Sequence, residues 1–156
     1  MRMRKKLTVS IGADHAGFVM KKRLAAYLKT LRVSVVDRGA KKLLPKDDYP
    51  DYAYRVAKDV ATRHARGILV CGSAQGVCMV ANKVRGVRAA TLGTVHDARL
   101  TREHNDANVL CLSGWGLPLD QAKAIVRAFL ETPYSGETRH ERRLRKLAII
   151  ERKTMR

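Results

Sequence analysis

Cysteine, aromatic residues and long apolar runs are all scarce in this sequence. Its three cysteines include no CxxC pair, and their odd number argues against a framework of disulfide bonds. No apolar run approaches the roughly 20 residues of a membrane span. The apolar stretch 7–13 is too short for a signal peptide, because Asp14 and His15 interrupt it at once. These absences predict a soluble, cytoplasmic protein with no membrane partner.

The low aromatic content bears on how the positive charge is interpreted. Lysine and arginine number 32 against 14 acidic residues, which gives a net charge of +18, while aromatic residues make up 5% of the chain. Such a charge attracts phosphorylated metabolites and nucleic acids alike. The sequence has no aromatic stacking ladder, zinc-finger spacing or GXXG loop of the kinds that nucleic-acid-binding modules use. We therefore expect no nucleic-acid partner despite the charge.

Short apolar segments alternate with segments of helical periodicity along the chain. The expected strands are 7–11, 33–36, 67–70, 87–90 and 108–112, with Gly12 ending the first. Helices are expected at about 17–31, around 52–60, at 77–83 and 97–104, around 119–130, and from about 137 onward. This alternation predicts a five-stranded parallel sheet in a three-layer α/β/α sandwich, Rossmann or flavodoxin-like. We expect one domain over residues 1–156, with a basic lead at 1–6 and a frayed tail at about 153–156.

Polar residues follow three of the expected strands. Asp14 and His15 follow the first strand, Asp48 and Tyr49 lie in the loop after the second, and the segment 71–76 follows the third. Ligands of parallel sheets bind beyond the carboxyl ends of the strands. We therefore expect these residues to converge on one rim of the sheet and to form a binding site there.

The segment Cys71-Gly-Ser-Ala-Gln-Gly76 leads from a strand into a helix. Its small residues let the backbone approach a ligand closely, and the helix start offers N–H groups for a phosphate or a developing oxyanion. The same environment favours the thiolate of Cys71, the form that can remove a proton from carbon. The alternative is that Cys71 is a buried strand-end residue in a tight turn. Cys78 and Cys111 fall where packing is the expected role.

The pair Asp14-His15 also has two interpretations. The carboxylate can assist proton transfer at a hydroxyl, and the imidazole can meet an anion. Alternatively, Asp14 caps the helix that begins near Gly17.

Two further groups of polar residues carry the same ambiguity. His104 and Asn105 suit proton shuttling and hydroxyl recognition, but their surroundings also describe an ordinary turn. Arg139 and Arg143 are four residues apart on the last expected helix, so they share a face and can clamp a phosphate. A solvated basic face is the alternative. The functional interpretation of these polar residues becomes stronger if they all lie on one rim of the sheet.

The residues reached so far resemble the ribose-5-phosphate isomerase type B family, which includes the galactose-6-phosphate isomerase subunits. The resemblance runs in order from Leu7 to about Arg152. Its matching segments are IGADHAGF (11–18), DYPDYA (48–53), GILVCGS (67–73), ANK (81–83), GVRAA (86–90), REHNDANV (102–109) and RHERR (139–143).

This resemblance implies an aldose–ketose isomerase that interconverts ribose 5-phosphate and ribulose 5-phosphate through a cis-enediolate, with no metal and no organic cofactor. It implies Cys71 as the base that moves a proton between C1 and C2, and Ser73 as the group that helps protons move at the sugar oxygens. The backbone N–H groups of Gly72 through Gly76 would stabilise the enediolate.

The resemblance also implies roles for the remaining polar residues. His104, with Asp14, would open the furanose ring. The family builds its site across a homodimer, with a tetramer as the larger alternative, and the neighbouring subunit supplies the His104 region. The implied sugar contacts are Asn105, Asp48 and Tyr49, and the implied phosphate ligands are His15, Arg139 and Arg143.

Three residues depart from the family pattern. Ala74 replaces a glycine in the anion loop and would be strained if that position needs a positive φ. Gln75 brings an amide beside the oxyanion site, where an apolar residue is common. Trp115 stands where many members have an arginine that reaches the substrate or phosphate across the dimer. These departures leave open another tetrose or hexose phosphate as substrate, or a non-catalytic sugar-phosphate or nucleic-acid binding relative. A nucleotide-binding flavodoxin-like module is the weakest alternative.

Overall fold

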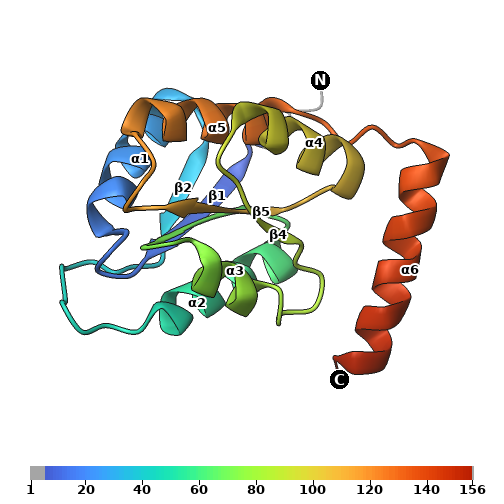
Figure 1. Cartoon of the computed structure of the whole chain (residues 1–156), viewed down its shortest axis with the longest axis horizontal. Coiled ribbons are helices and arrows are strands. Elements are labelled where there is room, and N and C mark those ends of the chain that lie inside the picture. Colours follow the sequence, from blue (N-terminus) through green and yellow to red (C-terminus); the bar gives the residue numbers. More distant parts are fainter. Residues whose placement is uncertain (1–5, 156) are drawn as a thin grey trace.

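Five parallel strands form the central sheet of the computed structural model, which describes residues 6–155 (Figure 1). They are β1 (Thr8–Ala13), β2 (Ser34–Asp37), β3 (Arg66–Cys71), β4 (Ala89–Thr91) and β5 (Val109–Ser113). Across the sheet they follow the order β2-β1-β3-β5-β4. The predicted parallel sheet is therefore confirmed.

Helices cover both faces of the sheet. They are α1 (Phe18–Thr30), α2 (Tyr49–Arg63), α3 (Gln75–Ala81), α4 (Val95–Asn105), α5 (Leu119–Glu131) and α6 (Thr138–Thr154). α1, α4 and α5 lie on one face and α2 and α3 on the other, whereas α6 stands beside these layers next to α4 (Figure 1). The predicted α/β/α sandwich is confirmed. Across residues 6–155, every helix is too short or too polar to traverse a bilayer.

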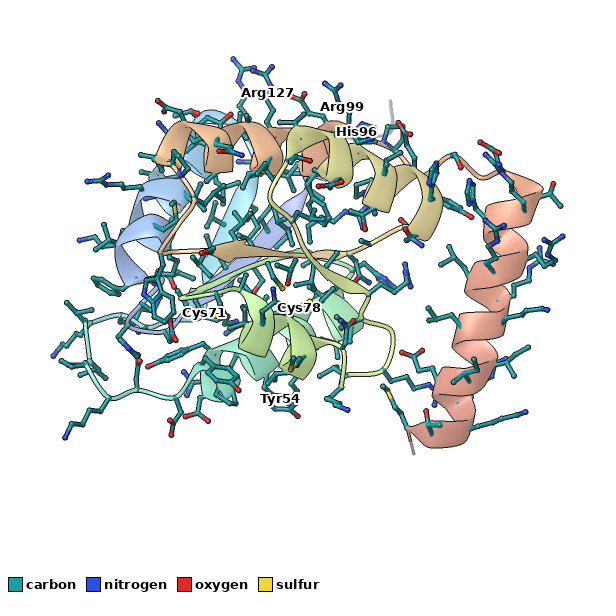
Figure 2. The ribbon with its side chains drawn as sticks, viewed as in Figure 1. Tyr54, Cys71, Cys78, His96, Arg99 and Arg127 are labelled. Carbon is teal, nitrogen blue, oxygen red and sulfur yellow. The ribbon has the colours of Figure 1, made fainter. Side chains whose placement is uncertain are left out.

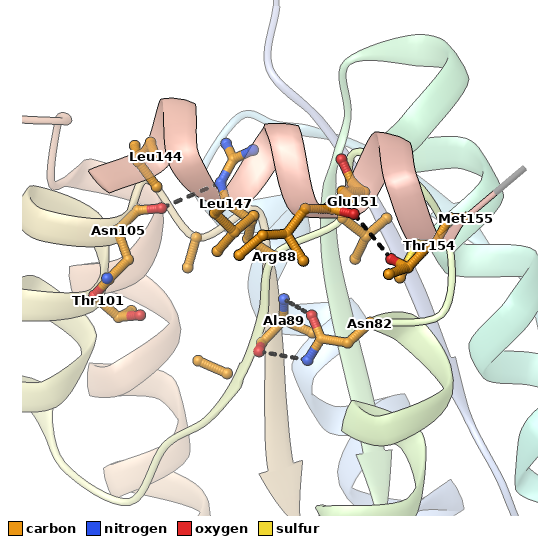
Figure 3. Close-up of a pocket in the computed structure, with 14 residues that line it drawn as sticks. Asn82, Arg88, Ala89, Thr101, Asn105, Leu144, Leu147, Glu151, Thr154 and Met155 are labelled. Carbon is orange, nitrogen blue, oxygen red and sulfur yellow. Dashed lines mark hydrogen bonds between the residues drawn. The ribbon is translucent and has the colours of Figure 1, made fainter. Parts of the chain in front are cut away.

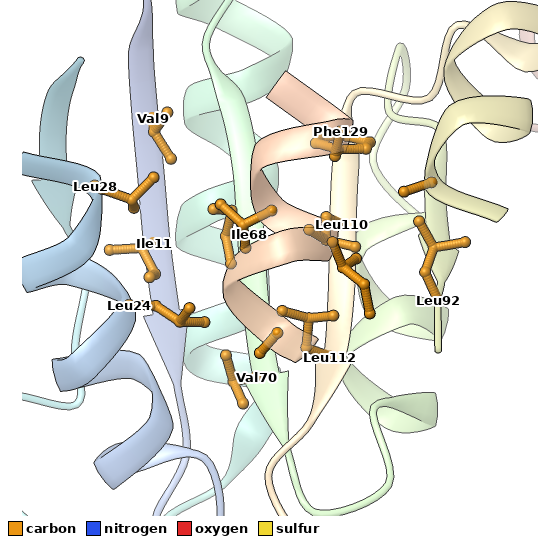
Figure 4. Packing of buried hydrophobic residues seen from close by; sticks show 14 of the residues in the cluster. Val9, Ile11, Leu24, Leu28, Ile68, Val70, Leu92, Leu110, Leu112 and Phe129 are labelled. Carbon is orange, nitrogen blue, oxygen red and sulfur yellow. The ribbon is translucent and has the colours of Figure 1, made fainter. Parts of the chain in front are cut away.

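The strands are buried on both faces, which explains their lack of alternating polar residues. Ile68 and Val70 of β3 pack with Phe129 in the cluster beneath α1 and α5 (Figure 4). Leu69 and Cys71 of the same strand belong to the opposite cluster, beneath α2 and α3. Burying each large apolar side chain contributes about 1.5–3 kcal/mol. Cys71 is therefore oriented by the packing of β3 against α2 and α3.

The predicted end of the first strand is wrong. β1 continues through Gly12 to Ala13, because these residues pair with Leu69 and Val70 of β3. A Cβ atom on Gly12 would lie only 3.0 Å from Cγ2 of Val56, so the missing side chain lets α2 pack closely here. Glycine therefore serves helix packing at this position and does not end the strand.

The predicted frayed tail is also wrong as far as the structure describes it. α6 continues to Thr154, and the N–H of Met155 donates to the carbonyl of Glu151 at 2.8 Å. Met155 also lines a groove between α6 and the sheet, so the helix end has packing partners. Of the predicted basic lead, only Lys6 is described, and residues 1–5 and 156 lie outside the described part of the chain.

Candidate functional site

The carboxyl ends of β1 and β3 meet at a topological switch point of the sheet. From β1 the chain passes to β2 on one side, and from β3 it passes to β4 on the other. Ligands of such sheets bind in the crevice between the two diverging connections. Ala13 pairs with Val70, so Asp14 and Cys71 leave the sheet side by side. The structure thus brings together two of the segments predicted to converge.

Cys71 lies at the end of β3, beside the first turn of α3 (Figure 2). The residue is 4% exposed, whereas Ser73 is exposed. The carbonyl of Cys71 accepts the N–H of Gly114 at 2.8 Å, and the carbonyl of Gly72 accepts the hydroxyl of Ser113 at 2.7 Å. These bonds fix the loop after β3 to the end of β5. They fix the backbone that carries the thiol.

Ala74 adopts the backbone conformation that was predicted to strain an alanine. Its φ is 69° and its ψ is −11°, in the left-handed region that favours glycine. The side chain is fully buried in the cluster beneath α2 and α3. Gln75, which follows it, is exposed at the start of α3. The loop therefore keeps the shape that a glycine would permit, at a cost in backbone strain.

Two aromatic rings flank the loop from Gly72 to Gly76. A Cβ atom on Gly72 would lie 2.5 Å from the indole of Trp115, and one on Gly76 would lie 2.6 Å from the ring of Tyr49. Glycine is therefore favoured at both positions, because the nearby aromatic rings leave no room for a Cβ atom. Trp115 is nevertheless 77% exposed and Tyr49 is 39% exposed, so one ring on each side remains open to a ligand.

His15 is held by a residue that the sequence did not single out as a ligand. The backbone N–H of His15 donates to Oδ1 of Asp47 at 2.9 Å, and its ring Nδ1 lies 2.8 Å from the same oxygen. Burial alone would raise the pKa of Asp47, but hydrogen bonds from His15 and Tyr52 hold it below its usual value. With Nδ1 bonded to this carboxylate, Nε2 of His15 is the nitrogen available to an anion.

Asp14 has the second of its two predicted roles in the structure, that of a cap. Its Oδ1 accepts the N–H of Gly17 at 3.1 Å, so it caps the turn that leads into α1. The residue is only 6% exposed, and burial raises the pKa of its carboxyl above the usual value, with the bond from Gly17 opposing that change. Asp48 and Tyr49 stand exposed where α2 begins, and Asp48 makes no side-chain capping bond.

A second group of predicted residues lies at the opposite end of the sheet. His104 and Asn105 end α4, which precedes β5, and the ring of His104 stacks on that of His140 in the first turn of α6. Arg139 and Arg143 lie one turn apart on α6 and are both exposed, and Arg139 pairs with Glu137 at 2.8 Å. The predicted sharing of one helix face by the two arginines fits this placement.

Within one chain the two groups do not meet. Ser113 pairs with Cys71 across β5 and β3, and Asn108 precedes β5 at its other end. Ser113 is five positions after Asn108, which at ~3.3 Å per residue is about 17 Å along the strand. Within one chain, the residues after β1, β2 and β3 therefore lie on one rim of the sheet. His104, Asn105, Arg139 and Arg143 lie at the other end.

Cys111 belongs to the cluster beneath α2 and α3, and Cys78 packs against that cluster. Cys111 is fully buried, as predicted for a packing residue, whereas Cys78 in α3 is half-buried (Figure 2). A hydrogen bond from Cys111 lowers the pKa of Cys78 to about 6, aided by Thr91 and opposed by burial. Within the residues described, no cluster of three or more His, Cys, Asp or Glu side chains is arranged to hold a metal ion.

A groove of about 480 Å³ separates α6 from the edge of the sheet (Figure 3). Leu144, Leu147 and Ile150 line it from α6, and Ala89 lines it from β4. Asn82 closes the hydrogen-bonding edge of β4, because its amide bonds both the N–H and the carbonyl of Ala89, at 2.8 and 2.9 Å. The apolar side of α6 is therefore only partly covered by its own chain.

Asp47 and His140 also belong to the two groups of residues, although the sequence did not single them out. Asp47 stands next to the predicted Asp48, and His140 stands inside the matched segment 139–143, so both were close to residues already chosen. Their partners, His15 and His104, are 32 and 36 residues away in the chain. Only the tertiary structure joins these pairs.

Comparison with known proteins places these features in a family. A model of the family described as Ribose/Galactose Isomerase matches residues 9–147. The probable ribose-5-phosphate isomerase B of Mycoplasma genitalium is 42% identical over 148 residues, which cover 94% of this chain and 97% of that protein. Ribose-5-phosphate isomerase B of Escherichia coli is 38% identical over 146 residues, or 93% and 97% of the two chains.

Solved structures agree with these sequence matches. The crystal structure of ribose-5-phosphate isomerase B from Mycoplasma genitalium with bound ribulose-5-phosphate superposes with a TM-score of 0.92 at 40% identity, covering 97% of this chain and all of that one. The type B ribose 5-phosphate isomerase of Trypanosoma brucei superposes with a TM-score of 0.90 at 43% identity, covering 94% and 100%.

Proposed function

Because the chain belongs to the ribose/galactose isomerase family, we propose that it interconverts ribose 5-phosphate and ribulose 5-phosphate. It is an aldose–ketose isomerase of sugar phosphates. The observation that carries the choice of substrate is the match over 97% of the chain to a solved relative with bound ribulose-5-phosphate. Sugar phosphates are charged and kept inside cells, so the proposed place of action is the cytoplasm.

Cys71 is the proposed base for the proton transfer. Its thiolate takes the proton from C2 of the open-chain aldose, and the electron pair moves through C1 to O1 to give a cis-enediolate. The thiol then returns the proton to C1, while the proton of the O2 hydroxyl passes to O1, leaving a ketone at C2. Ser73, which is exposed two residues after Cys71, is the proposed carrier of that second proton. A general acid–base group of this kind contributes about 10²–10⁴-fold.

The backbone N–H groups of Gly72 through Gly76 are the proposed stabilisers of the enediolate oxygens. The bonds that tie this loop to β5 support the proposal, because donors that are fixed beforehand need no reorganisation during the reaction. The near burial of Cys71 also supports it, since a shielded base is protected from competing water.

We further propose that a second copy of the chain completes each site. The 14–15 and 71–76 segments of one subunit would face the His104 end of its partner, because about 17 Å of sheet separates the two groups within one chain. In that arrangement His104, with Asp14 across the interface, opens the furanose ring, and Asp48, Tyr49 and Asn105 contact sugar hydroxyls. His15 of one subunit and Arg139 and Arg143 of the other hold the phosphate. A homodimer is the smallest such assembly, and a tetramer of two dimers would serve equally.

Replacing the proposed base tests the mechanism. The Cys71→Ala variant should lose turnover of ribose 5-phosphate by about 10²–10⁴-fold or more, because no other thiol lies at the end of β3. Binding of ribulose 5-phosphate, followed by calorimetry, should remain close to that of the wild type. The Cys78→Ser variant is the matched control and should keep its activity, although the pKa of Cys78 is lowered to about 6. Undiminished turnover by Cys71→Ala would remove Cys71 from the mechanism.

A different sugar phosphate is the second candidate, and Trp115 is the observation that favours testing it. Its indole lies against Gly72 and is 77% exposed, so it occupies one wall of the crevice where the family pattern has an arginine. Turnover of a panel of tetrose, pentose and hexose phosphates by the wild-type protein distinguishes the candidates. Preference for the pentose supports the first. Complete inactivity, with salt-sensitive retention of RNA or DNA, would indicate a binding relative instead.

A further inference from the structure

His140 is a buried imidazole whose presence the proposed mechanism does not explain. It is 4% exposed, and its Nε2 has no hydrogen-bond partner among the described residues. The nearest carboxylate oxygen, Oε2 of Glu137, is 3.9 Å away, which is beyond hydrogen-bonding distance. Leaving a buried polar atom unpaired is unfavourable. Such a cost at the edge of a candidate site calls for a function.

The contact that His140 does make is with His104. The two ring centroids are 4.4 Å apart and the rings are within 13° of parallel, so the imidazoles are stacked. Across residues 6–155, no hydrogen bond is recorded for the ring of His104, which therefore has the stack as its main orienting contact. The loop before α6 is fixed near the same point, because Ser135 donates to the carbonyl of Glu103 at 3.2 Å.

The charges around His140 favour an uncharged ring. His104 faces it from α4, Arg139 and Arg143 lie near it on α6, and Glu137 lies at the start of that helix. Burial lowers the pKa of His140, His104 and Arg139 lower it further, and Glu137 opposes them. A neutral His140 places no positive charge against the adjacent ring of His104.

We infer that His140 is a positioning residue, whose neutral ring holds His104 in the orientation that ring opening of the sugar requires. This inference rests on the proposed function, because it assumes that His104 acts on the closed furanose. It adds a specific consequence: His140 matters for substrates that must open a ring, and not for the later proton transfer at Cys71.

An analogue that cannot form the ring separates these two steps. 4-Deoxyribose 5-phosphate keeps the aldehyde, the C2 hydroxyl and the phosphate, but has no O4 with which to close a furanose. It therefore reaches Cys71 already open. The wild-type protein should isomerise both compounds, and a wild type that turns over ribose 5-phosphate but not this analogue would overturn the inference.

The variants are His140→Ala, His140→Phe and His96→Ala. Removing the stack in His140→Ala should lower kcat/KM for ribose 5-phosphate by about tenfold to a hundredfold, because small misplacements of a catalytic group cost this much. The same variant should lose less than about twofold on the analogue, since that substrate does not need His104. His140→Phe keeps a flat ring for stacking and should restore most of the activity. His96, exposed on the same helix α4, is the matched control and should have no effect.

Each of the following outcomes would contradict the inference that His140 positions His104 by stacking, except the last, which concerns the proposed function. Equal losses on both compounds would show a general structural role for His140, and unchanged turnover of ribose 5-phosphate would show no role. A large loss in His140→Phe, despite the retained ring, would also contradict positioning by stacking. Failure of the wild-type protein on every sugar phosphate would instead reject the proposed function, so the two failures are distinguishable.

Discussion

Ala74 holds a left-handed backbone conformation that costs a residue with a Cβ atom about 1–2 kcal/mol. Replacing it with glycine removes this strain but adds chain entropy to the unfolded state. We predict that Ala74→Gly raises the free energy of unfolding by about 0.5–1 kcal/mol, as measured by urea denaturation. Ala81→Gly in the same helix α3 is the control and should destabilise. A loss of stability in both variants would mean that the backbone at Ala74 is not strained.

At the scale of single residues, the sequence predicts a member of the candidate site where a reactive side chain stands at or just after the end of a strand. Cys71 ends a strand and Asp14 and His15 follow one, so the rule for parallel sheets identifies them without a structure. Asp47 and His140 have no such marker, because their roles arise from contacts with residues 32 and 36 positions away. A sequence pattern reports on neighbours within a few residues and carries no record of such long-range pairing.

At the scale of elements, buried ion pairs tie the helices to the sheet. The carboxylate of Asp59 on α2 accepts two bonds from Arg38 at 2.6 and 2.7 Å and one from Ser10 of β1 at 2.8 Å. Burial alone would raise the pKa of Asp59, but these bonds hold it below 3.8. The ionised carboxylate therefore joins α2 to β1 and to the segment after β2, which borders the candidate site.

This lowered pKa sets the direction of an acid effect. Because the folded state binds the proton of Asp59 less tightly than the unfolded state, the stabilisation is complete above the unfolded pKa near 3.8 and is lost as pH falls from there through the lower pKa of the folded state. We predict that Asp59→Asn lowers the free energy of unfolding by about 2–3 kcal/mol at pH 7, and that the difference from wild type shrinks below pH 4. Asp120→Asn, at a side chain 97% exposed, is the control. A difference that stays constant down to pH 2.5 would contradict the assignment.

The order and type of the helices and strands were predictable from apolar periodicity, while some of their ends were not. Gly12 is a turn residue by composition, yet it continues β1 because a close approach by Val56 favours glycine there. Thr154 and Met155 look like a free terminus, yet α6 keeps its hydrogen bonds to that point. In both cases packing against another element decides the boundary, and local sequence does not record that packing.

At the scale of the whole molecule, the sheet separates the candidate site into two groups of residues. The crevice with Cys71 opens at the carboxyl ends of the strands, and the stacked histidines with the two arginines stand at the other end, beside α4 and α6. The sequence resemblance implied that the neighbouring subunit supplies the His104 region. The separation of about 17 Å along β5 is the reason for proposing that a second copy of the chain completes each site.

The most direct test of this account is activity in mixed dimers of two inactive variants. Cys71→Ala and His104→Ala chains carrying different tags are co-expressed, and the doubly tagged species are compared with each variant alone. If sites are shared, a mixed dimer contains one site with both groups intact, so a random mixture should recover about a quarter of the wild-type activity. Purified mixed dimers should recover about half. Mixed dimers that are as inactive as the single variants would contradict the central claim that each site is completed by a second copy of the chain.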